Sequence, residues 1–262
     1  MRSGPVSADV QQNGVGTVTL RRPDVHNALD DVTIAELTAI FHDLDADSRV
    51  RVVILAGEGK TFCAGADLNW MRRTADCSEE DNLRDANTLA EMFRVLDELR
   101  KPTIAAVHGS AFGGGVGLTA CADIAIASDE AEFCLSEVRL GLIPAVISPY
   151  VVRAIGPRQA RRYLLTAERF SAAEACRIGL VHEVVPAREL AEKVREVSAA
   201  LAQGGPNALG AAKAMVAKVA YRPIDRPEMQ YTAERIAALR ASAEGREGMS
   251  AFLEKRPPKW RA

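Results

Sequence analysis

The sequence is poor in the features of disulfide-stabilised, zinc-binding and membrane proteins. Its 262 residues include only five cysteines, an odd number without a CxxC pair, whereas a zinc site or a disulfide framework needs clustered cysteines. No apolar run approaches the roughly 18–20 residues of a membrane span, and the first ten residues lack the apolar core of a signal peptide. We therefore expect a cytoplasmic protein with reduced thiols, no metal site and no membrane association. The cysteines are Cys63, Cys77, Cys121, Cys134 and Cys176.

The chain also lacks an excess of charge of either sign. It has 33 Lys and Arg against 35 Asp and Glu, a formal net charge of −2. A chain so balanced has no overall field to gather nucleic acid, which leaves only a local basic patch as a route to such binding. Its 48% hydrophobic residues are ordinary for a globular protein, which excludes general disorder. We expect no nucleic-acid partner.

Short apolar runs alternate with helical stretches through the first part of the chain. The runs 50–56 and 103–107 are flanked by turn residues, which favours strands over pieces of buried helix. Strands interleaved with helices indicate an α/β domain. The predicted strands are 17–20, 50–56, 103–107, 123–127 and 132–135, and the predicted helices are 31–44, 81–99 and 114–122.

After Pro144 the pattern becomes helical. Ser171 and Glu174 form a capping-box signature, and Gly179 supplies the left-handed stop of that helix. No low-complexity linker separates the two parts, so we predict one α/β body with a helical C-terminal region. The helices predicted here are 160–165, 171–178, 189–201, 207–220 and 226–240, with a short one inside 248–260.

Three consecutive glycines, Gly113–Gly115, stand where a helix is expected to begin. Each costs about 1 kcal/mol relative to alanine in a helix, so a tight turn, close packing or a ligand must require them. Gly115-x-Gly117-x-x-Ala120 matches the dinucleotide fingerprint as a string, but five residues separate the preceding strand from the glycines. A P-loop is excluded because no Gly-Lys-Ser/Thr is present. The functional interpretation that remains is an amide at a helix N-terminus that stabilises a developing oxyanion.

Two further segments can contribute to the same chemistry. The small-residue loop 61–68 follows a predicted strand and could offer a second amide; a plain connection with Asp67 as a helix cap explains it equally well. Glu137 ends an apolar run and enters a loop punctuated by Gly141 and Pro144. A partly desolvated carboxyl there would have a raised pKa suited to general acid–base catalysis, although a surface or capping role is the simpler interpretation of Glu137 alone.

These segments, in this order and spacing, resemble the enoyl-CoA hydratase/isomerase (crotonase) superfamily over nearly the whole chain. The resemblance implies an α/β fold, a spiral of ββα units over residues 1–200, followed by a helical trimerisation region over residues 201–262. It also implies homotrimers or dimers of trimers. The matching segments are His26–Leu29, Phe62–Asp67, Ala106–Gly115, Cys121–Ile124, Phe133–Pro144 and Ala251–Arg256.

The resemblance assigns roles to individual residues. The backbone amides of Ala66 and Gly114 would form an oxyanion hole for the thioester carbonyl, with Glu137 as the catalytic carboxylate. Phe252 and Lys255 match positions that reach the adenine and phosphate end of CoA, often of a neighbouring subunit; taken alone, Lys255 is a solvated surface lysine. The positions implied to lie along coenzyme A are Ala28, Ala64, Asp67 and Leu68. No cofactor is implied beyond the CoA that the substrate carries.

One position departs from the family pattern. Hydratases of this family commonly carry a second glutamate just after the glycine run, where this chain has Gly117. Members with a single glutamate at the position of Glu137 include enoyl-CoA isomerases. The wider segments around Gly113 and Glu137 nevertheless look most like bacterial hydratases of branched, carboxylated enoyl-CoAs, such as the methylglutaconyl-CoA type of leucine breakdown.

Three functions follow from this pattern. The first is hydration of a 2-enoyl-CoA, the second is Δ3-Δ2-enoyl-CoA isomerisation, and the third is a noncatalytic acyl-CoA- or RNA-binding role. Arg139 bears on the substrate: along an extended chain it would lie on the same side as Glu137, where it could pair with a terminal carboxylate of the acyl group. An ion pair with an acidic residue across a subunit contact explains Arg139 as well.

Overall fold

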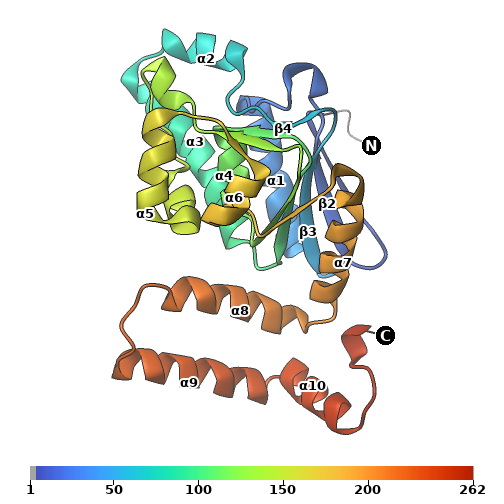
Figure 1. Ribbon diagram of the computed structural model, residues 1–262. Coiled ribbons are helices and arrows are strands. Elements are labelled where there is room, and N and C mark those ends of the chain that lie inside the picture. The colour runs from blue at the N-terminus through green and yellow to red at the C-terminus, as the bar shows by residue number, and fades with distance from the viewer. Residues whose placement is uncertain (1–3, 262) are drawn as a thin grey trace.

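The computed structural model describes residues 4–261, which form an α/β body with an arm of three helices below it in Figure 1. The body contains two sheets. The larger has the strand order β1-β2-β3-β5-β7-β10, antiparallel only between β1 and β2. The smaller has the order β4-β6-β8-β9, antiparallel only between β8 and β9.

From β3 to β8, consecutive strands alternate between the two sheets. β3 and β4, β5 and β6, and β7 and β8 each supply one strand to the larger sheet and one to the smaller, and a helix follows each pair. This is the spiral of ββα units expected from the resemblance. The strands are β1 Val6–Val10, β2 Val15–Leu20, β3 Val52–Gly57, β4 Thr61–Cys63, β5 Thr103–Val107, β6 Ser110–Phe112, β7 Ile124–Ser128, β8 Glu132–Cys134, β9 Phe170–Ser171 and β10 Glu183–Val185.

The larger sheet is covered on both faces, which explains why its strands read as unbroken apolar runs. On one face, Ile54, Ile104 and Ile126 pack against Leu190 and Val194 of α7. The other face joins the main core, which includes buried side chains of α1, α3, α4 and α5. The helices of the body are α1 Asp31–Ala46, α2 Leu68–Ala75, α3 Glu79–Glu98, α4 Gly114–Cys121, α5 Ser148–Thr166, α6 Ala172–Ile178 and α7 Leu190–Ala202.

The predicted elements are present, with shifted ends. The largest shift is in α5, which begins at Ser148 rather than at residue 160 and is kinked at Gly156, whose φ is 72°. Ser171 caps α6 by accepting a hydrogen bond from the Glu174 amide, as the capping-box signature indicates. The Glu174 carboxylate accepts from Tyr163 and Arg177 instead of closing the box. The pattern did not reveal β1, β4, β6, β9 and β10, of which β4, β6, β9 and β10 have at most three residues.

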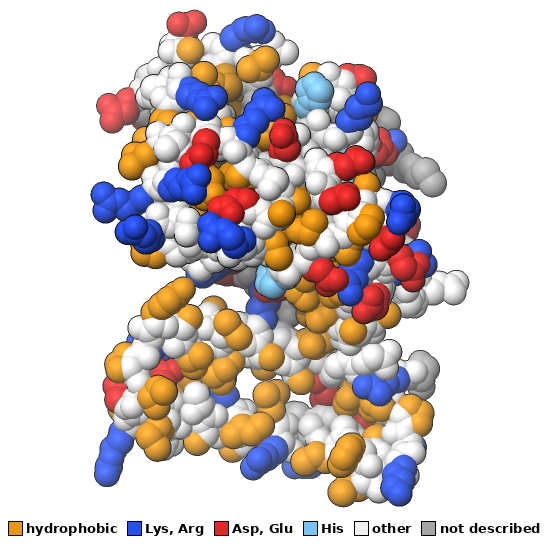
Figure 2. Space-filling model, viewed as in Figure 1, with side chains coloured by type: hydrophobic (Ala, Val, Ile, Leu, Met, Phe, Trp, Pro, Cys, Tyr) orange, Lys and Arg blue, Asp and Glu red, His pale blue; other side chains and the backbone are white. Residues whose placement is uncertain are grey.

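The arm leaves the body after α7 and consists of α8 Pro206–Val219, α9 Arg226–Ala241 and α10 Ala243–Leu253. Lys213 of α8 reaches Asp123 of the body at 2.9 Å, and Arg51 donates to the Gly204 carbonyl at 2.6 Å. Apolar side chains cover much of the arm's visible surface in Figure 2. Within residues 4–261 no helix is long and apolar enough to cross a membrane.

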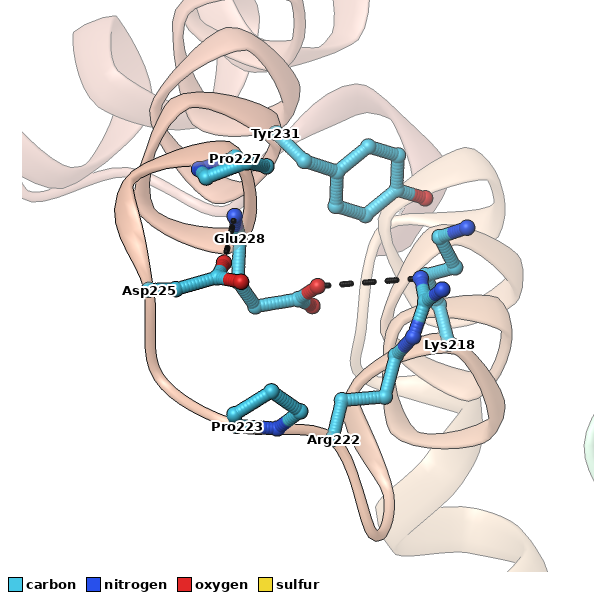
Figure 3. A pocket seen from close by; sticks show the side chains of 7 residues that line it. All are labelled: Lys218, Arg222, Pro223, Asp225, Pro227, Glu228 and Tyr231. Atoms are coloured by element: carbon cyan, nitrogen blue, oxygen red, sulfur yellow. Dashed lines mark hydrogen bonds and ion pairs between the residues drawn. The ribbon is translucent and has the colours of Figure 1, made fainter.

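A hollow of about 260 Å³ lies where α8 turns into α9 (Figure 3). The carboxylate of Glu228 faces the Arg222 guanidinium there at 3.7 Å, and Asp225 accepts a hydrogen bond from the Glu228 amide as the cap of α9. The Lys218 ammonium lies 5.4 Å from the centre of the Tyr231 ring. These contacts hold the corner of the helical hairpin, away from the glycine-rich loops of the body.

Asn27 connects three loops at the N-terminal side of α1. Its side chain is buried, and its amide group donates to the Glu58 and Thr61 carbonyls at 2.8 and 2.7 Å. Its oxygen accepts from the Arg22 amide at 2.9 Å. The backbone at Asn27 has a φ of 54°, in the left-handed region that asparagine tolerates better than most residues.

We expect Asn27→Ala to lower the free energy of unfolding by about 2–4 kcal/mol, because it leaves buried carbonyls without donors and places alanine at a positive φ. Urea unfolding at one fixed protomer concentration measures the change. Asn87→Ala, at an exposed position of α3, is the matched control and should shift the free energy by less than about 0.5 kcal/mol. Equal effects of the two substitutions would contradict a structural role for Asn27.

Candidate active site

The two small-residue loops recognised in the sequence meet backbone to backbone. A Cβ atom on Gly65 would lie 2.8 Å from the Phe112 carbonyl oxygen and 3.4 Å from the Gly114 nitrogen. A Cβ on Gly115 would lie 2.3 Å from the Cys63 carbonyl oxygen. Because β4 and β6 are parallel neighbours, the loops that follow them emerge at the same edge of the smaller sheet. Glycine is required at these positions by close packing.

Each loop presents a free backbone amide. Gly114 is the first residue of α4, and the first helical bond runs from the Gly117 amide to the Gly113 carbonyl. Ala66 is exposed, and its neighbours are held on either side: the Gly65 carbonyl accepts from the Leu29 amide at 2.7 Å, and the Asp67 amide donates to the Leu29 carbonyl at 2.9 Å. Neither the Ala66 nor the Gly114 amide donates a hydrogen bond within the part of the chain that the structure describes.

The carboxylate of Glu137 lies against the same loop. A Cβ on Gly113 would be 2.9 Å from its Oε1 atom, and the Oε2 atom is buried without a hydrogen-bond partner among residues 4–261. Burial raises the pKa of Glu137 above its ordinary value, with a smaller opposing contribution from a backbone hydrogen bond. The structure therefore brings Glu137 close to the glycine turn that ends in the Gly114 amide.

The conformation of the segment after Glu137 differs from the prediction. Residues Glu137–Leu140 form a 3₁₀ helix rather than an extended chain. Residues two apart in such a helix point in directions about 120° apart, so the expectation that Arg139 lies on the same side as Glu137 was wrong. Arg139 is exposed, and its guanidinium makes no ion pair within the described residues.

The remaining positions implied to contact CoA fall into two groups. Ala64 and Leu68 lie two residues from Ala66 along the chain. Ala28 is brought to the same loop by the short parallel pairing of residues 26–29 with 64–67, in which the Ala64 amide donates to the His26 carbonyl at 3.0 Å. Phe252 and Lys255 lie in and just after α10 of the arm, below the body that holds the two loops (Figure 1). Phe252 is 83% exposed.

The side chain of Asp67 turns inward. Its side chain is buried, and its Oδ1 atom caps α2 by accepting from the Asn69 and Trp70 amides at 2.8 and 3.2 Å. Its Oδ2 atom receives the Arg22 guanidinium at 2.9 Å. Burial alone would raise the pKa of Asp67, but these amides and Arg22 together lower it below its ordinary value. Both carboxylate oxygens are therefore engaged within the protein.

Buried side chains occupy the space beside Gly117, the position of the second family glutamate. A Cβ on Gly117 would lie 2.3 Å from the Cγ2 atom of Ile147 and 2.9 Å from the Cε1 atom of Phe93. Both of these side chains are buried. Ile147 was not singled out in the sequence, since only the folded structure shows that the segment before α5 covers α4.

Comparisons with known proteins identify the family and the fold. The profile of the enoyl-CoA hydratase/isomerase family matches residues 10–262. The crystal structure of an enoyl-CoA hydratase from Shewanella pealeana is 45% identical, with a TM-score of 0.95 over 98% of this chain and 96% of that one.

Two curated relatives have matches of similar extent. The crotonyl-CoA hydratase of Syntrophomonas wolfei is 34% identical over 94% of both chains. The (E)-benzylidenesuccinyl-CoA hydratase of Thauera aromatica is 34% identical over 98% of this chain and 99% of its own. With a family profile that spans almost the whole sequence and a matching fold, the chain belongs to the enoyl-CoA hydratase/isomerase family.

Proposed function

We propose that the protein is an enoyl-CoA hydratase that adds water across the double bond of a 2-enoyl-CoA thioester. The observation that carries the proposal is the meeting of Ala66, Gly114 and Glu137: two free amides on contacting loops, with a partly buried carboxylate beside them. The hydratase names of the Shewanella, Syntrophomonas and Thauera proteins support this reaction over others of the family.

In the proposed reaction the thioester carbonyl oxygen accepts hydrogen bonds from the Ala66 and Gly114 amides. Glu137 takes a proton from water as the water oxygen forms a bond to C3, and the electron pair of the double bond moves to the carbonyl oxygen as an enolate. Amides fixed before the reaction stabilise that charge without reorganisation. The enolate then collapses as C2 receives a proton, for which the protonated Glu137 is the donor that this chain provides. The step uses no cofactor beyond the CoA of the substrate.

We further propose that the acyl group carries a second carboxylate, as in a methylglutaconyl-CoA type of substrate. The support is the sequence resemblance together with the Thauera relative, whose named substrate is the half-thioester of a substituted succinate. The 3₁₀ turn places Arg139 on a different side from Glu137, and Arg139 is the candidate partner of that carboxylate only because its exposed guanidinium is not engaged by an acidic side chain of the described residues.

We propose that the arm assembles the chain into a homotrimer or a dimer of trimers. The support is the amount of apolar surface that the arm leaves exposed: no residue of α8 or α9 is fully buried. Val216 and Ile224 are 68% and 89% exposed, and Leu253 of α10 is 78% exposed. Such a surface is typical of a face that is covered in an assembly.

The five free thiols support a reducing, cytoplasmic location.

Isomerisation of a 3-enoyl-CoA to a 2-enoyl-CoA is the second candidate function. The observation that favours it is Gly117, which leaves Glu137 as the one family carboxylate of this site. The same amides would hold the enolate while Glu137 moves a proton between C2 and C4. Assays with crotonyl-CoA, methylglutaconyl-CoA and a 3-enoyl-CoA, followed at the absorbance of the conjugated thioester, separate the two functions.

Glu137→Gln should lower the hydration rate by about 10²–10⁴-fold, because the amide keeps the shape of the side chain and cannot transfer the proton. The measurement is kcat for the best of the three thioesters, with CoA binding measured alongside. Glu132→Gln is the matched control: Glu132 is an exposed residue of β8 whose carboxylate pairs only with Arg169 on the surface. Near-full turnover of the Glu137 variant with normal CoA binding would contradict the assignment of Glu137 as the catalytic carboxylate.

The raised pKa of Glu137 predicts two effects of pH. The ionised form is the base, so kcat/KM should fall on the acidic side with a midpoint above 4.5, the ordinary value. In the folded protein the ionised form is disfavoured, so stability should fall as pH rises from the unfolded pKa through the higher folded pKa.

Unfolding temperatures measured across this range check the second effect. Glu137→Gln should be more stable than the parent at pH 7, and the difference should vanish at pH values below the unfolded pKa, where the parent carboxyl is protonated in both states. If the parent instead became more stable relative to the Glu137→Gln variant as pH rises, the folded pKa of Glu137 would be lowered rather than raised.

Arg139→Leu should reduce kcat/KM for methylglutaconyl-CoA about ten- to a hundred-fold more than for crotonyl-CoA. The physical reason is the loss of a charge-assisted hydrogen bond, worth roughly 1.5–3 kcal/mol, to a terminal carboxylate that crotonyl-CoA lacks. Arg158→Leu, an exposed position of α5, controls for the loss of one surface charge. An equal loss on both substrates assigns Arg139 to structure.

A further inference from the structure

Arg22 makes an unusual set of contacts directly behind the loop that presents the Ala66 amide. Its Nη2 atom lies 2.9 Å from the Oδ2 atoms of both Asp30 and Asp67. Its Nη1 atom donates to the Ala28 carbonyl at 2.5 Å. The side chain is only 21% exposed. One guanidinium thus holds two carboxylates and one carbonyl from two separate segments of the chain.

Each of the two carboxylates is itself a helix cap. Asp30 accepts from the Thr33 amide at 2.8 Å at the start of α1, and Asp67 accepts from the Asn69 and Trp70 amides at the start of α2. Arg22 therefore connects the first turn of α1 to the first turn of α2. Capping contacts fix the backbone of the first helical turn, so this connection sets how the two helix starts lie relative to each other.

Ala66 lies in the segment whose position these contacts determine. The residues from Ala64 to Ala66 have small side chains or none, and Gly65 has a φ of 87°. The loop is held instead by its pairing with Leu29, which bonds the residues on both sides of Ala66. Arg22 contacts both segments of this pairing: Ala28 and Asp30 on one segment and Asp67 on the other.

We propose that Arg22 is a positioning residue that directs the Ala66 amide toward the thioester oxygen. The inference rests on the oxyanion hole of the proposed function. Donors in such a hole act at 2.7–3.1 Å from the developing charge, so a small rotation of the 64–67 segment would weaken the bond without removing CoA from the site. The Arg22 guanidinium is engaged by Asp30, Asp67 and the Ala28 carbonyl, and not by Glu137.

The test compares two adjacent arginines. Arg22→Met keeps the apolar stem and removes the guanidinium, and we expect kcat to fall about 10- to 100-fold while KM changes by less than about threefold. That loss is smaller than the roughly 10²–10³-fold effect of removing a donor outright. Arg21→Met is the control, because Arg21 pairs only with Glu58 at the surface, at 2.9 Å with side-chain exposures of 40% and 45%. Its kcat should stay within about twofold of the parent.

A second readout separates positioning from stability. Acetoacetyl-CoA bound to the folded protein ionises to an enolate that absorbs in the near ultraviolet, and an oxyanion hole increases the enolate fraction at a given pH. We expect Arg22→Met to lower this fraction per bound ligand, and Arg21→Met to leave it unchanged. A role confined to folding would lower the unfolding temperature and leave the enolate fraction of the folded protein unaltered.

Conservative variants keep the proposal testable where Arg22→Met folds poorly. Arg22→Lys supplies one charge but cannot span three acceptors, so it should restore stability more than kcat. Asp67→Asn retains an oxygen for the cap and weakens the link to Arg22, and it should reproduce the loss of kcat and of enolate. Normal kcat and a normal enolate fraction in the folded Arg22 and Asp67 variants would overturn the inference. A parent protein that neither hydrates an enoyl-CoA nor forms the enolate would instead overturn the proposed function.

Discussion

The candidate site depends on the close approach of two backbone segments that only glycine permits. Gly65 lies directly against the Phe112 carbonyl, and Gly115 lies against the Cys63 carbonyl. A Cβ atom at either position would clash with a backbone carbonyl oxygen, so a side chain there would force the loops after β4 and β6 apart. Because the two proposed donors come one from each loop, their separation is set by this contact. The glycines that weaken α4 as a helix are thus required by the geometry of the site.

The same packing determines the electrostatic state of Glu137. Its carboxylate covers Gly113 where any larger residue would stand, and one of its oxygens is buried without a partner among the described residues. A buried and unpaired carboxylate destabilises the folded protein at neutral pH and raises the pKa of the group. By contrast, Asp67 is buried nearby with both oxygens satisfied, and its pKa is lowered. The two carboxylates differ in the partners that the fold gives them.

Particular residues show how far the sequence determines these features. The apolar runs at 50–56 and 103–107 predicted strands because both faces of the larger sheet are buried. Strands β4 and β6, with three residues each, have no such pattern and form through pairing with each other. Glu137, Ala66 and Gly114 could be proposed from glycine spacing and family resemblance. The orientation of Arg139 could not be predicted, because the sequence pattern did not reveal that Glu137–Leu140 forms a short 3₁₀ helix. Arg22 was missed for another reason: its partner Asp67 is 45 residues away, and only the fold places them together.

The packing around Gly117 bears on what kind of site this is. Ile147 and Phe93 occupy the space into which a side chain at 117 would project, with the Ile147 Cγ2 atom only 2.3 Å from a Cβ there. A glutamate could not enter without displacing buried side chains of α3 and of the segment before α5, and such overpacking typically costs about 1–3 kcal/mol. The absence of the second carboxylate is therefore built into the core rather than confined to one position. In the proposed hydration Glu137 serves both proton transfers, so what separates hydration from isomerisation in this proposal is whether a water molecule can lie beside that single carboxylate.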